Sequence, residues 1–109
     1  GISLHRIGGH TNGLQAVRVH TRRGWLVLAS DAAHYSLNLS RRSPFPIVYH
    51  VGDMLRGFDR LRALADSDDH VIPGHDHNVL LEYPRLRPDV PDIVALHSNP
   101  SPETRMQTS

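Results

Sequence analysis

The chain has 109 residues, no cysteine and a nearly balanced charge, with 12 Lys and Arg residues against 11 Asp and Glu residues. This length fits one small domain, and the charge balance argues against a dedicated nucleic-acid surface. The lack of cysteine excludes disulfides and thiolate metal sites and fits a cytoplasmic protein, while no apolar run approaches the roughly 20 residues of a membrane span.

The first third of the chain predicts three strands. The apolar residues of 2–7 indicate a short extended segment, and the β-branched stretch 14–20 indicates a second strand. A hairpin turn is expected at 21–24. The almost continuous apolar run 25–30 is typical of a strand that is buried on both faces of a sheet.

The remaining chain predicts a long loop over 36–50, one clear helix from Asp53 to about residue 65, and a short strand at 70–73. The order of elements indicates an α/β fold with a mixed sheet and one main helix. We expect one domain over 1–97, followed by a disordered polar tail over 98–109.

Three segments share a design that suits a metal site. Each places a metal-capable side chain at a small-residue turn where a strand ends, and the three side chains are His10, Asp31 and His75. Two imidazoles and a carboxylate form a ligand set that suits zinc, and a carboxylate can bridge two metal ions. The pattern alone leaves a structural role open, because an Asp at a strand end often caps a turn.

The same segments resemble motifs of the metallo-β-lactamase-fold hydrolases, in the same order. GGHTNGL resembles the GHTxGH segment, whose first His is a metal ligand and falls on His10, with Leu14 in the place of the second His. GWLVLASDAAHY is similar to the strand that ends in the metal-bridging Asp, here Asp31. HVIPGHD resembles the late strand and turn whose His, here His75, ligates the second metal. The resemblance covers 1–97 and implies the C-terminal half of the αβ/βα sandwich.

Within that superfamily, the run DAAHY, a proline-containing loop, a helix and PGHD are most similar to the N-acyl homoserine lactonases. Those enzymes use a Tyr just after the bridging Asp to hydrogen-bond the substrate, and the resemblance assigns this role to Tyr35, with His34 beside it. A packed aromatic side chain is the competing interpretation of Tyr35. The implied reaction is the two-zinc opening of a small-molecule lactone ring, the chemistry of quorum quenching.

One part of the family pattern is absent. The HxHxDH signature, which supplies further ligands and the acid–base Asp, lies before this region in the superfamily, and the chain has no such run. We therefore expect a fragment that needs an N-terminal half, holds zinc weakly or not at all, and is inactive alone. The alternatives are a glyoxalase II-like thioesterase or other metallo-hydrolase, and a non-catalytic binding or assembly module.

Overall fold

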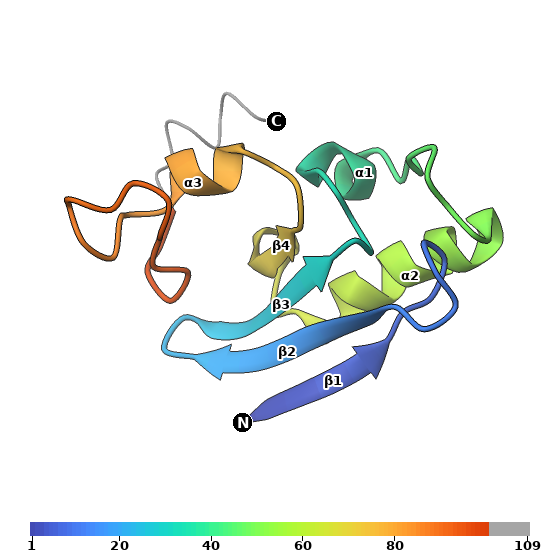
Figure 1. Cartoon of the computed structure of the whole chain (residues 1–109). Coiled ribbons are helices and arrows are strands. Elements are labelled where there is room, and N and C mark those ends of the chain that lie inside the picture. Colours follow the sequence, from blue (N-terminus) through green and yellow to red (C-terminus); the bar gives the residue numbers. More distant parts are fainter. Residues whose placement is uncertain (101–109) are drawn as a thin grey trace.

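The structure is a computed structural model, and it describes residues 1–100 of the chain (Figure 1). Four strands form one sheet in the order β1-β2-β3-β4, with β1 at Ile2–Arg6, β2 at Gln15–Thr21, β3 at Gly24–Ser30 and β4 at Val71–Pro73. The helices are α1 at Ser36–Ser40, α2 at Val51–Leu64, the 3-10 turn η1 at Asp68–His70 and α3 at Asn78–Glu82.

The sheet is mixed, as the order of predicted elements indicated. β1 pairs antiparallel with β2, and β2 forms the predicted hairpin with β3. β4 pairs parallel with β3 after a crossover that contains α1 and α2. The expected α/β class is therefore confirmed, and the parallel pair brings the carboxyl ends of β3 and β4 to the same edge of the sheet.

The main core lies between α2 and one face of the sheet. Met54, Phe58 and Leu61 follow one another at helical spacing, and all three are at most 1% exposed. They belong to the same buried cluster as Val27 of β3. Leu26, the neighbouring residue of β3, is 1% exposed on the opposite face, so the prediction of a strand buried on both faces is confirmed.

The segment 36–50 contains a helical turn that the sequence analysis did not predict. α1 forms there because the side chain of Asn38 accepts a hydrogen bond from the Tyr35 amide at 2.8 Å and donates one to the Ser43 carbonyl at 3.0 Å. α2 begins at Val51, two residues before the expected start, because the imidazole of His50 caps it by accepting a hydrogen bond from the Asp53 amide.

The C-terminal part of the described chain is fastened to the β2–β3 turn. Arg22 donates hydrogen bonds to the His97 carbonyl at 3.1 Å and to the Ser98 hydroxyl at 2.9 Å. Of the polar tail expected over 98–109, residues 101–109 lie outside the described residues. Within 1–100, no helix has the length and apolar character needed to cross a membrane.

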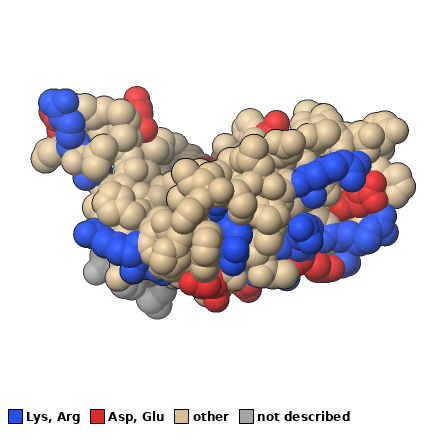
Figure 2. Space-filling view, turned by 90° about the horizontal axis from the view of Figure 1, so that it is seen from below, with Lys and Arg blue, Asp and Glu red and all other residues tan. Residues whose placement is uncertain are grey.

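Charged residues are dispersed over the face that includes β1. Figure 2 shows basic and acidic side chains interspersed there, separated by broad areas without charge. Ile2 and Leu4 of the edge strand β1 are 73% and 63% exposed, so part of the uncharged surface of the molecule is apolar.

Two leucines test the position of the core. We expect Leu61→Ala to lower the free energy of unfolding by about 2–5 kcal/mol, because the side chain is 0% exposed and its removal leaves a cavity under the sheet. Leu81→Ala, at a position that is 56% exposed, is the matched control and should change it by no more than about 0.5 kcal/mol. Urea unfolding followed by circular dichroism measures both, and equal losses would contradict the packing described here.

Candidate metal centre

The site forms where the chain leaves the parallel strands β3 and β4. Beyond the last strand residues, the Gly74 amide donates to the Ala33 carbonyl and the His75 amide donates to the His34 carbonyl, both at 2.9 Å. These two hydrogen bonds continue the pairing of the strands into the loops that follow. They place His34 and His75 side by side, with ring centroids 4.3 Å apart.

Gly74 is required for this approach of the two loops. A Cβ atom at position 74 would lie 2.3 Å from the carbonyl oxygen of Ser30, and no real Cβ contact is that short. Ser30 itself has a positive φ of 52°, which turns the chain sharply at the end of β3. The glycine and the strained serine together bring Asp31 next to the turn that carries His75.

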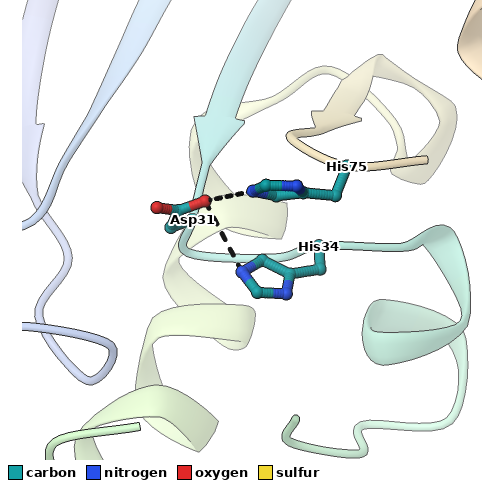
Figure 3. A group of neighbouring side chains, drawn as sticks. All are labelled: Asp31, His34 and His75. Carbon is teal, nitrogen blue, oxygen red and sulfur yellow. Dashed lines mark hydrogen bonds and ion pairs between the residues drawn. The ribbon is translucent and has the colours of Figure 1, made fainter. Parts of the chain in front are cut away.

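Asp31 is the centre of the group (Figure 3). Its Oδ1 accepts a hydrogen bond from Nε2 of His75 at 2.7 Å and lies 3.5 Å from Nε2 of His34. Its Oδ2 lies 3.5 Å from Nε2 of His10. The predicted convergence of His10, Asp31 and His75 is therefore what the structure shows, and each carboxylate oxygen faces a different set of imidazoles.

The ring of His10 is held by backbone from the segment before α2. Its Nδ1 lies 2.7 Å from the Ile47 carbonyl, and since a carbonyl only accepts, Nδ1 carries the proton. The other ring nitrogen, Nε2, faces the Asp31 carboxylate. Orientation of a histidine by a backbone carbonyl in this way is typical of metal ligands.

The main-chain position of His10 depends on a close approach between the 8–10 turn and α2. Gly9 has a φ of 91°, and a Cβ there would lie 2.6 Å from the Cα of Met54. The Gly9 carbonyl accepts hydrogen bonds from the amides of Tyr49 and His50 at 2.7 and 2.9 Å. The turn therefore has little freedom to move away from Asp31.

His34 is a member of the group that the sequence analysis noted only as a neighbour of Tyr35. Its side chain is 16% exposed, and its ring stacks on Phe45 at 3.6 Å with an angle of 10° between the planes. Burial lowers the pKa of His34, and the nearby His75 lowers it further, while the Asp31 carboxylate raises it. The sequence signal for this residue is its position three residues after Asp31.

Tyr35 lies beside His34. It occupies the N-cap of α1, its side chain is half exposed, and its ring sits edge-on to His34 with centroids 6.4 Å apart. Its assignment as a substrate contact stays a prediction.

The electrostatics of the group favour an ionised carboxylate. The hydrogen bond from His75 lowers the pKa of Asp31, and the charges of His10, His75 and His34 act in the same direction, while partial burial opposes them. At neutral pH the centre is thus a carboxylate surrounded by three imidazoles.

The donor set fits a zinc ion. Asp31, His34 and His75 each offer a ligand atom, and these atoms all lie within 4.8 Å of one another. Ligands of a tetrahedral zinc ion lie roughly 3.4 Å apart, so small side-chain rotations would bring the three into coordination distance.

Comparison with solved structures shows where this architecture occurs. The chain is similar to an N-acyl homoserine lactone hydrolase with the product N-hexanoyl-L-homoserine at its catalytic metal centre, at 24% identity and a TM-score of 0.62, over 72% of this chain and 32% of that one. A variant of AiiA from B. thuringiensis with N-decanoyl-L-homoserine at the active site gives the same values. A quorum-quenching N-acyl homoserine lactone lactonase gives 25% identity and a TM-score of 0.60, over 71% and 32%.

The fold is that of the lactonases. The likeness confirms the expected metallo-β-lactamase type of fold, of which this chain forms a part. The chain spans about one third of the length of these structures. No protein-family model and no curated protein sequence matches it.

The turn at Gly74 provides a test of the site's construction. We expect Gly74→Ala to lower the free energy of unfolding by about 1–3 kcal/mol, because the added methyl group collides with the backbone of Ser30. Gly13→Ala is the control, since a Cβ at position 13 has no atom within 4 Å, and we expect a change within about 0.5 kcal/mol. Thermal unfolding measures the difference. If both variants behave alike, the loops do not approach each other as described.

Proposed function

We propose that this chain contributes part of the ligand set of the metal centre in a hydrolase that opens the lactone ring of N-acyl homoserine lactones. The observation that carries the proposal is the position of Asp31, whose two oxygens face His75 and His10 separately. A carboxylate in this position is suited to bridge two metal ions, and each of its neighbours is suited to ligate one of them.

Zinc is the metal that these residues would hold. When bound, it supplies a Lewis acid that polarises a carbonyl group and makes water more acidic. The residues of this chain would orient the ligand side chains and supply the negative charge of a carboxylate. The Ile47 carbonyl fixes the ring of His10, the low pKa of Asp31 keeps the carboxylate available as a ligand, and the 74–75 turn holds His75 against it.

Tyr35 is proposed as the residue that hydrogen-bonds the substrate. Its ring is half exposed at the start of α1 and lies next to the His34 ring, at the border of the metal-ligand group. From there a phenol hydroxyl can donate a hydrogen bond to a carbonyl or oxyanion, which stabilises charge that develops as a lactone is attacked.

Two zinc ions need more protein ligands than His10, Asp31 and His75 provide, since catalytic zinc sites use three protein ligands each. We therefore assign the remaining ligands, and the acid that protonates the leaving alkoxide, to protein outside these 109 residues. The support for a lactone as substrate is the likeness in fold to hydrolases whose structures hold homoserine products at the metal centre or active site.

The proposal is tested by joining the chain to a segment that carries an HxHxDH motif. We expect the joined protein to open N-hexanoyl-homoserine lactone and the 109-residue chain alone to show no turnover, because loss of the general acid by itself removes about 10²–10⁴ in rate. In the joined protein, His10→Ala, Asp31→Ala and His75→Ala should each reduce activity by at least about 10²-fold, and His97→Ala should leave it unchanged. Chromatography of the opened product measures all of these.

A glutathione thioester assayed alongside distinguishes the substrate class. Faster hydrolysis of the thioester would replace the lactonase by a thioesterase and leave the metal residues in place. Full activity of Asp31→Ala would contradict the role of the bridging carboxylate.

A further inference from the structure

We propose that His34 is a metal ligand, so that Asp31, His34 and His75 together hold one divalent cation of the zinc class without help from any other chain. The inference deepens the proposed function and rests on the metal centre described there. It adds a third protein ligand to the Oδ1 side of Asp31, where the motifs of the sequence indicated only His75.

The first observation is an unsatisfied polar atom. Nε2 of His34 is buried and has no hydrogen-bond partner within the described part of the chain. It lies 3.5 Å from Oδ1 of Asp31, but that oxygen already accepts the shorter hydrogen bond from His75 at 2.7 Å. Buried imidazole nitrogens are normally paired, and a bound cation would satisfy this one.

The second observation is that the ring is fixed in an orientation suited to ligation. Phe45, itself 6% exposed, covers one face of the imidazole in a parallel stack at 3.6 Å. The His34 carbonyl is tied to the His75 amide, which fixes the main chain at the same point. If position 34 only filled space, any flat apolar side chain could serve there. The imidazole instead directs its Nε2 toward the Asp31 carboxylate.

The third observation is the composition of the resulting set. Two imidazoles and one carboxylate, with ligand atoms within 4.8 Å of one another, are the three protein ligands of an open catalytic zinc site, in which the fourth position is left for water or substrate. His10 lies on the other side of the carboxylate, at Oδ2, and remains available for a second ion. With this third ligand, we expect the chain to bind one zinc ion, in place of the weak or absent binding that the sequence analysis predicted.

The experiment uses Co²⁺ as a spectroscopic probe of the 109-residue chain. The chain has no cysteine, so His34→Cys introduces the only thiol. A thiolate ligand gives cobalt an intense near-ultraviolet charge-transfer band that no imidazole or carboxylate produces. We expect this band in His34→Cys, and no band in the control Tyr35→Cys, which places the thiol one residue away at a half-exposed position.

Affinity provides the second readout. Calorimetric titration of the native chain should give one Co²⁺ per chain, and His34→Ala and His75→Ala should each weaken binding about tenfold or more. His77→Ala removes an exposed imidazole outside the group and should bind as the native chain does. Circular dichroism of the metal-free variants establishes that they are folded.

The outcomes separate the two proposals. A native chain that binds no cobalt or zinc overturns the proposal that Asp31, His34 and His75 hold an ion by themselves, and leaves the proposed function in place, because that function takes further metal ligands from outside this chain. Binding that depends on His75 but is unchanged in His34→Ala, with no charge-transfer band in His34→Cys, overturns only the role of His34. If the position 34 variants do not fold, nitrogen NMR of the native chain decides, because zinc must shift the Nε2 resonance of His34, and an unshifted resonance overturns the proposal.

Discussion

The site depends on two backbone hydrogen bonds, from the amides of Gly74 and His75 to the carbonyls of Ala33 and His34. They extend the parallel pairing of β3 and β4 beyond the strands, so that two loops more than forty residues apart in sequence meet at one point. Two further features of the fold support that contact. Gly74 permits it sterically, and the α2 crossover brings β4 into register with β3 while burying the sheet face beneath. Because the contact is made by main chain, the cluster is organised before any metal binds.

The stability of the fold and the chemistry of the site are largely separate. The core of Met54, Phe58 and Leu61 is apolar, while the Asp31 carboxylate is 36% exposed and its ion pairs are partly screened by water. The imidazoles around Asp31 therefore contribute little to folding. Their arrangement is better explained as a binding site for a cation, since it gathers imidazole nitrogens and one negative charge in a small space at the carboxyl ends of the two strands.

Much of the fold follows from local sequence patterns. The run 25–30 and the helical spacing of 54–65 each have a single consistent interpretation, and the structure contains both elements where they were expected. The meeting of His10, Asp31 and His75 was predictable only from the order of motifs, because sequence separation gives no distance. His34 could not be found in this way, since its burial and orientation come from Phe45, in a segment whose helical turn depends on the side chain of Asn38 rather than on any periodic pattern.

Anomalous diffraction at the zinc edge, from crystals of this chain grown with zinc, tests the central claim most directly. The account predicts one strong peak within bonding distance of the Asp31 carboxylate and of Nε2 of His75 and His34, with the hydrogen bond between Asp31 and His75 replaced by coordination. A structure in which that hydrogen bond persists, and zinc is absent or bound to other side chains, would contradict it.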